Sequence, residues 1–285
     1  MLKHRLITTF ILVPIVISTL FMLPFITFAL ITLLVCILGV WEWGKLISLI
    51  SIKQRIWLTV FCGFLQAQII LVILDCHSII SIWQVRCALW SAFFWWITAT
   101  LLVCTYPHSA VLWNKSKLQQ IAFCMLTIIP FFYGVLALRQ HNYNINYFTG
   151  SWWLLYVMTL VWAVDSGAYF FGQLLGNHKM VPSLSPKKTW EGFIGGLVTS
   201  AIIAWLFNKY APLNISPVTL LTCSIVASLA AVLGDLTESM FKREVGIKNT
   251  SHLIPGHGGI LDRIDSLTAA VPVFTFLILL IFNTI

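Results

Sequence analysis

The chain has 285 residues, of which 59% are hydrophobic and only 9% are Asp, Glu, Lys or Arg. Because a soluble protein carries about 25% charged residues, this composition excludes a water-soluble globular domain and indicates a protein whose solvent is the lipid bilayer. The formal net charge of +8 must therefore lie mostly between membrane spans.

Nine apolar segments are candidates for membrane-spanning helices, which need roughly 17–25 residues. The apolar run over residues 6–43 is too long for one span and contains Pro14 and Pro24, so we divide it into two. The other expected spans are, in chain order, residues 56–74, 85–104, 121–138, 152–171, 190–207, 219–236 and 267–282. The sequence therefore predicts an all-α integral membrane protein with about nine transmembrane helices.

Positive charge predicts how these helices are oriented. If the N-terminus is cytoplasmic, all of the 17 Lys and Arg residues except Arg86, Arg139 and Lys209 fall in cytoplasmic segments. Short loops rich in Lys and Arg stay in the cytoplasm. We therefore expect a cytoplasmic N-terminus and a C-terminus on the opposite side, with a basic cytoplasmic face that attracts anionic lipids and nucleotides.

Acidic residues divide this continuous membrane domain into two parts. Only Glu42 and Asp75 lie in the first half, and the other seven acids fall between residues 165 and 265. An ionised carboxylate in hydrocarbon is costly, so each acid within a span should face a polar cavity, a cation or a partner. We expect residues 1–150 to form scaffold helices and residues 151–285 to form a catalytic region with cytoplasmic loops.

The first polar stretch of the catalytic region is VDSGAYFFGQLLG, residues 164–176. Asp165 lies inside an otherwise apolar helix, next to the small residues Ser166, Gly167 and Ala168. Small residues allow helices to approach closely, so close packing is one explanation of this stretch. A role for Asp165 in function is the other, and we favour it because an acid inside a span is costly.

The second polar stretch is SPKKTWEGFIGG, residues 185–196. Ser185 and Pro186 indicate a loop, after which a span opens at Trp190. Lysines directly before a helix N-terminus suit a phosphate site. The leading glycine of a Walker A loop is missing, and an ordinary basic cytoplasmic loop explains the spacing equally well.

The third polar stretch runs from residue 234 to residue 266 and carries two acid pairs, Asp235 with Glu238 and Asp262 with Asp265. A spacing of three residues places each pair on one helix face, so the pairs can converge across the loop between them. Carboxylate oxygens suit Mg²⁺. A salt-bridged loop is the alternative, and a zinc site at His252 and His257 is disfavoured because no Cys lies nearby. The bases that would bind phosphates are Lys242, Arg243, Lys248 and Arg263, and the glycines that would let the backbone approach a ligand are Gly256, Gly258 and Gly259.

The order of these motifs resembles the phosphatidate cytidylyltransferase family, also called CDP-diacylglycerol synthases, of the bacterial type. The resemblance covers the whole chain but is specific mainly from Asp165 onward. One departure is Asn249, where the family usually has Asp; an amide is a poorer Mg²⁺ ligand. The matching residues are Asp165, Ala168, Tyr169, Ser185, Pro186, Lys188, Thr189, Glu191, Gly192, Gly234, Asp235, Glu238, Ser239, Lys242, Arg243, Lys248, Pro255, Gly256, His257, Gly258, Gly259, Asp262, Arg263, Ile264 and Asp265.

The resemblance implies that CTP and phosphatidate give CDP-diacylglycerol and pyrophosphate, with the lipid phosphate attacking the α-phosphorus of CTP. It implies that Asp235 and Asp262 are direct ligands in a two-cation centre with Mg²⁺, for which K⁺ is a candidate second cation. Metal binding is assigned to Asp235, Asp262 and Asp265, and catalysis to these three together with Lys248. Substrate binding is assigned to Asp165, Ser185, Lys188, Thr189, Glu191, Ser239, Lys242, Arg243, His257, Gly258, Gly259 and Arg263.

The expected partners and location follow from the same resemblance. The substrates would be CTP and phosphatidate, the solvent the lipid bilayer, and the assembly a homodimer, with no nucleic-acid partner. The resemblance places the protein in the bacterial inner membrane as a multi-pass enzyme whose active site faces the cytoplasm.

An ion-coupled membrane transporter is the alternative function. It too would carry intramembrane acids such as Asp165 and Asp235. Such a transporter should have broken helices near the bilayer midplane and paired halves. Here the charged clusters lie toward one face and no repeat is visible, which favours the enzyme.

Overall fold

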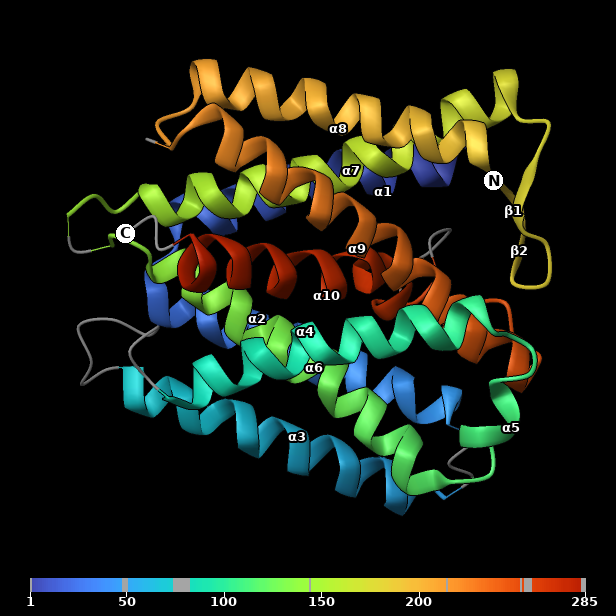
Figure 1. The fold of residues 1–285 in the computed structure, drawn as a ribbon. Coiled ribbons are helices and arrows are strands. Elements are labelled where there is room, and N and C mark those ends of the chain that lie inside the picture. Colours follow the sequence, from blue (N-terminus) through green and yellow to red (C-terminus); the bar gives the residue numbers. More distant parts are fainter. Residues whose placement is uncertain are drawn as a thin grey trace.

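The computed structural model describes residues 2–47, 51–73, 83–143, 145–213, 215–251, 253 and 258–282, with side chains from residue 10 onward. These residues form a bundle of helices with one small hairpin (Figure 1). The helices are α1 (Leu2–Met22), α2 (Phe25–Leu46), α3 (Ile52–Ile73), α4 (Trp83–Cys104), α5 (Ala110–Trp113), α6 (Lys117–Gln140), α7 (Thr149–Leu175), α8 (Trp190–Tyr210), α9 (Pro217–Val245), α10 (Leu261–Phe276) and the π-helical turn η2 (Leu277–Ile281). The strands are β1 (Lys179–Val181) and β2 (Ser185–Thr189).

Within the described residues, eight helices are long and apolar enough to cross a membrane: α2, α3, α4, α6, α7, α8, α9, and α10 continued by η2. Each matches one expected span. The remaining expected span is α1, where the stretch Phe10–Met22 is apolar but shorter. The prediction of an all-α integral membrane protein is confirmed.

Helix α10 lies at the centre of the bundle (Figure 1) and contacts α9, α6, α4, α7 and α2. In its membrane-spanning part 72% of residues are buried inside the protein, against 28% for α8. The α9–α10 contact is close because α9 has Gly234 there: a Cβ on Gly234 would lie 2.5 Å from the carbonyl oxygen of Asp265. The next residue, Asp235, is therefore held against the start of α10.

The hairpin β1–β2 lies where the sequence predicted a loop at Ser185 and Pro186. The strands pair antiparallel, with Lys179 opposite Thr189 and Val181 opposite Ser185. The buried side chain of Leu184 anchors the turn. The hairpin extends beyond the helix ends at one end of the bundle (Figure 1).

The long helices alternate in direction along the chain (Figure 1). Helices α1, α3, α6, α8 and α10 begin at the hairpin end of the bundle, and α2, α4, α7 and α9 end there. The opposite end carries Arg86, Arg139 and Lys209 at helix ends. The first helix therefore starts at the basic end of the molecule, and η2 finishes at the other.

Candidate active site

A polar cavity of about 410 Å³ lies toward the hairpin end, between α7, β2, α8, α9 and α10. It gathers residues from all three polar stretches of the sequence. The predicted site residues that line it are Asp165, Lys188, Thr189, Asp235, Lys242, Asp262, Arg263 and Asp265. The expected convergence of the α9 and α10 acids across the intervening loop is thus observed.

Asp235 is held by a base from the hairpin. The Asp235 Oδ2 atom lies 2.7 Å from Lys188 Nζ, and both side chains are partly buried. The Ser239 hydroxyl, one turn further along α9, donates a hydrogen bond to Asp235 Oδ1 at 3.4 Å. Strand β2 thus brings Lys188 against Asp235 of α9, which joins the second and third polar stretches.

Asp262 is held more firmly, by one lysine and by backbone amides. Lys242 Nζ lies 2.6 Å from Asp262 Oδ1 and also forms an ion pair with Glu238. The amide of Thr250 donates to Asp262 Oδ2 at 3.1 Å, and that of Gly259 donates to the same oxygen at 2.7 Å. Because the residue is only 8% exposed, these bonds fix its carboxylate at the cavity wall.

Asp165 and Asp265 are the other two acids that line the cavity. Asp165 belongs to α7 and lines the same cavity as the acids of α9 and α10. Asp265 accepts the amide of Ser266 at 2.8 Å. The wall also carries Lys187, so the cavity is lined by both acids and bases. Such a surface can hold cations and phosphates together.

Several predicted substrate-binding residues do not line this cavity. Glu191 binds the hairpin instead, through His178 Nδ1 at 2.6 Å. Arg243 Nε donates to the carbonyl oxygen of Leu184 at 2.9 Å. Lys248 is exposed and Ser185 is half-buried in β2. Their predicted roles stay predictions, and His257 lies outside the described residues.

Gly258 and Gly259 shape the loop that meets Asp262. Gly258 has φ of +89°, a conformation that favours glycine, and a Cβ there would lie 2.6 Å from Asp262 Oδ2. A Cβ on Gly259 would overlap the hydroxyl of Thr250 and the carboxylate of Glu42. The two glycines therefore let two carboxylates approach the backbone closely.

Glu42 is the residue at this site that the sequence analysis did not assign. It comes from α2 and is fully buried against the start of α10. The sequence did hold a signal for Glu42, because an acid inside an apolar helix is costly to bury. The same argument identified Asp165. The partner segment, however, lies more than 200 residues along the chain, so spacing could not locate it.

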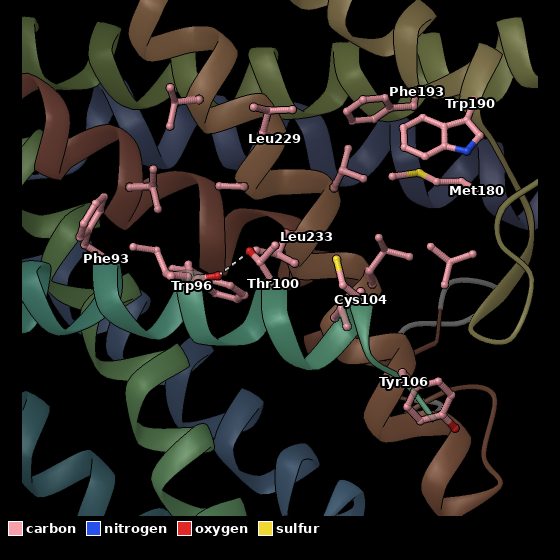
Figure 2. Close-up of a pocket in the computed structure, with 18 residues that line it drawn as sticks. Phe93, Trp96, Thr100, Cys104, Tyr106, Met180, Trp190, Phe193, Leu229 and Leu233 are labelled. Atoms are coloured by element: carbon pink, nitrogen blue, oxygen red, sulfur yellow. Dashed lines mark hydrogen bonds between the residues drawn. The ribbon is translucent and has the colours of Figure 1, made fainter. Parts of the chain in front are cut away.

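An apolar cavity of about 610 Å³ adjoins the polar one. Met180, Phe193 and Val232 line both cavities. Figure 2 shows side chains of α4 facing those of α9, with α8 and the hairpin closing one end. The labelled lining residues are Phe93, Trp96, Thr100, Cys104, Tyr106, Met180, Trp190, Phe193, Leu229 and Leu233. A molecule with a charged head and an apolar tail could occupy both cavities at once.

The sequence is similar to known proteins over nearly its whole length. The sequence pattern of the cytidylyltransferase family matches residues 3–281. The chain belongs to that family. It is 44% identical over 283 residues to the phosphatidate cytidylyltransferase of Haemophilus influenzae, an alignment that covers 97% of this chain and 98% of the relative. The enzyme of the same name from Pseudomonas aeruginosa is 37% identical over 280 residues, covering 98% and 97% respectively.

A third relative matches only part of the chain. The phosphatidate cytidylyltransferase of Staphylococcus saprophyticus is 39% identical over 166 residues, or 58% of this chain and 62% of the relative. Membership of an enzyme family argues against the transporter alternative.

The donor set of the polar cavity suits a hard cation of the kind that cytidylyl transfer would use. In the described part of the chain, its lining offers the carboxylates of Asp165, Asp235, Asp262 and Asp265 and no Cys or His, and Mg²⁺ prefers oxygen ligands. As the side chains stand, no three described His, Cys, Asp or Glu residues form a metal-binding group. Lys188 and Lys242 instead neutralise Asp235 and Asp262.

Proposed function

We propose that this protein is a phosphatidate cytidylyltransferase, which converts CTP and phosphatidate into CDP-diacylglycerol and pyrophosphate. The observation that carries the proposal is a polar cavity, lined by both acids and bases, that adjoins an apolar cavity. One substrate is a soluble polyanion and the other is a lipid with an anionic head. The names and near full-length matches of the relatives support the same activity.

The basic residues of the polar cavity would bind the two sets of phosphates. The ammonium groups of Lys188 and Lys242 form ion pairs with Asp235 and Asp262. Arg263 and Lys187 line the same wall. When substrates enter, these cations would turn to phosphate oxygens, with charge-assisted hydrogen bonds that offset the loss of their carboxylate partners.

We assign Asp235 and Asp262 as the residues that hold Mg²⁺, with Asp265 beside them and a second cation, such as K⁺, in the same centre. Bound Mg²⁺ would neutralise the phosphate charges that develop during transfer. Asp262 is suited to this role because two backbone amides already fix its orientation.

The chemical step needs no nucleophile from the protein. A phosphate oxygen of phosphatidate attacks the α-phosphorus of CTP and forms a new P–O bond. The bond from that phosphorus to the bridging oxygen of the β-phosphate breaks, and pyrophosphate leaves with the electron pair. The chain would contribute by aligning the two phosphates and by placing Lys188, Lys242 and Arg263 around the charge, which is where most of the rate gain in phosphoryl transfer arises.

The apolar cavity would hold acyl chain of the lipid substrate. Its walls on α4 and α9 are apolar, and Met180, Phe193 and Val232 connect it to the polar cavity. A phosphatidate head among the bases could therefore keep its tail in an apolar environment.

The location of the enzyme belongs to the same proposal. The hairpin end carries most of the Lys and Arg residues, and such segments remain in the cytoplasm. We therefore place the active site on the cytoplasmic face, the C-terminus on the opposite side, and the protein in the bacterial inner membrane, as its bacterial relatives suggest. The homodimer implied by the sequence resemblance stays a prediction.

The activity is tested with purified protein in mixed micelles containing phosphatidate, Mg²⁺ and CTP. CTP labelled on the α-phosphate should transfer its label into the organic phase, whereas CTP labelled on the γ-phosphate should leave its label in water as pyrophosphate. EDTA should stop the transfer. An active relative serves as the control. If that control transfers the α-label and this protein, although folded, does not, the result contradicts the proposed function.

A further inference from the structure

Glu42 makes four hydrogen bonds although it comes from α2, far from the polar stretches. Its Oε1 atom accepts from the hydroxyl of Ser251 and, at 3.1 Å, from the amide of Ile260. Its Oε2 atom accepts from the hydroxyl of Thr250 at 2.9 Å and from the amide of Leu261 at 2.8 Å. The side chain is fully buried, and these four donors, all among the described residues, satisfy both of its carboxylate oxygens.

Two of these bonds supply a cap that α10 lacks. The residue at the N-cap position is Ile260, which makes no side-chain capping bond. The first amides of a helix have no partner within the helix, and a carboxylate beside them is favourable. Glu42, a residue of α2, thus caps the start of α10. One of the amides that it binds is that of Leu261, the residue directly before Asp262.

Thr250 links Glu42 to Asp262, the proposed metal ligand. Its hydroxyl donates to Glu42 while its amide donates to Asp262. Gly259 also lies between the two acids. Its amide donates to Asp262 Oδ2, and its lack of a side chain leaves room for the Glu42 carboxylate. The backbone at residue 250 and the backbone just before α10 both orient Asp262, and Glu42 bonds to both of these segments.

We propose that Glu42 is a positioning residue of the active site: it clamps residue 250 to the start of α10 and so sets the orientation in which Asp262 meets its ligands. The effect on catalysis rests on the proposed function, but the clamp itself does not. The role requires a carboxylate. A glutamine has the same shape, but its NH₂ group would face two donors and leave at least one of them unpaired.

The test compares Glu42→Gln with wild type and with Thr32→Val. Thr32 is a buried residue of the same helix whose hydroxyl bonds only to its own helix, at Phe28, so this control measures a general disturbance of α2. Thr250→Val removes one donor to Glu42 without altering α2, and it serves if Glu42→Gln does not fold.

The first readout is amide hydrogen exchange of residues 258–265 in metal-free protein without substrate. We expect exchange to be at least about tenfold faster in Glu42→Gln, about threefold faster in Thr250→Val and unchanged in Thr32→Val, because local opening follows the loss of these bonds. The second readout is the Mg²⁺ concentration that gives half-maximal turnover. It should rise by about tenfold or more in Glu42→Gln, as for other residues that orient metal ligands.

Exchange within about twofold of wild type in both Glu42→Gln and Thr250→Val would overturn the proposal. Faster exchange with an unchanged Mg²⁺ dependence would also overturn it, because Glu42 would then be a structural cap only. An inactive wild-type protein would contradict the proposed function and not the clamp, since the exchange measurement uses no substrate.

Discussion

Single side chains in the polar cavity owe their positions to partners that are distant in sequence. Asp235 is held by Lys188, and Asp262 by Lys242 together with the amide of Thr250. The acids themselves were predictable, because a spacing of three residues places two carboxylates on one helix face. Their partners were not, because neither helix period nor local motif reports a contact between separate segments.

Asn249 is the position where the chain departs from its family pattern, and its side chain lines the polar cavity. We expect Asn249→Asp to turn over at wild-type rate or faster, since a carboxylate adds a charged oxygen to a wall that also carries the bases Lys242 and Arg263. Asn249→Leu, of similar size, should be slower. The measurement is the initial rate of label transfer. A loss of about tenfold in Asn249→Asp, a barrier increase of about 1.4 kcal/mol, would show that the site has adapted to the amide.

Helices and the hairpin differ in how well the sequence predicted them. The long spans followed from hydropathy, because each must satisfy its backbone within an apolar solvent. The hairpin did not, because its two strands are short and polar and are stabilised by tertiary contacts such as that of Arg243 with Leu184. The connection between α4 and α6 is also held by a tertiary contact, which joins Tyr106 to Glu244. Burial, together with Glu244, raises the pKa of Tyr106 to about 12. The Tyr106 hydroxyl donates a hydrogen bond to Glu244 on α9 at 2.9 Å.

The apolar cavity between α4 and α9 gives a prediction about the lipid substrate. Leu229 faces this cavity (Figure 2), whereas Ile225 lies one turn earlier on α9, is exposed to a similar degree and does not line it. Leu229→Trp should raise the KM for long-chain phosphatidate by about fivefold, since the bulkier ring fills space for an acyl chain. Ile225→Trp should have little effect.

The KM for CTP serves as the internal control for Leu229→Trp, because CTP would bind only in the polar cavity. A KM for phosphatidate that is equal in the Leu229→Trp and Ile225→Trp variants would place the acyl chains elsewhere.

The whole molecule has one basic end and one end with few charges. The sequence predicted this asymmetry from the distribution of Lys and Arg, and the alternating helix directions agree with it. The side of the membrane is a separate matter, which rests on the tendency of basic segments to remain in the cytoplasm.

Reporter fusions expressed in a bacterium test this orientation. Alkaline phosphatase fused after residue 285 should be active, because that enzyme folds only outside the cytoplasm, and green fluorescent protein at the same site should be dark. Fusions after Lys115, at the hairpin end between α5 and α6, should give the reverse result. The opposite pattern at both sites would invert the proposed topology and place the active site outside the cytoplasm.

The central claim is that the polar cavity performs cytidylyl transfer, and Asp262→Asn tests it most directly. The amide keeps the shape of Asp262 but removes the charge that pairs with Lys242 and would hold Mg²⁺. Glu244→Gln is the matched control, an acid-to-amide change on α9 at a residue that bonds Tyr106 and Asn114 rather than lining the cavity.

The measurement is the rate of transfer of α-labelled CTP into lipid by each folded variant. We predict that Asp262→Asn lowers turnover by at least about a hundredfold, a barrier increase of about 2.7 kcal/mol, while Glu244→Gln stays near wild type. Turnover of Asp262→Asn within about twofold of wild type, a barrier change of about 0.4 kcal/mol, would remove Asp262 from the mechanism and contradict the placement of the active site in this cavity.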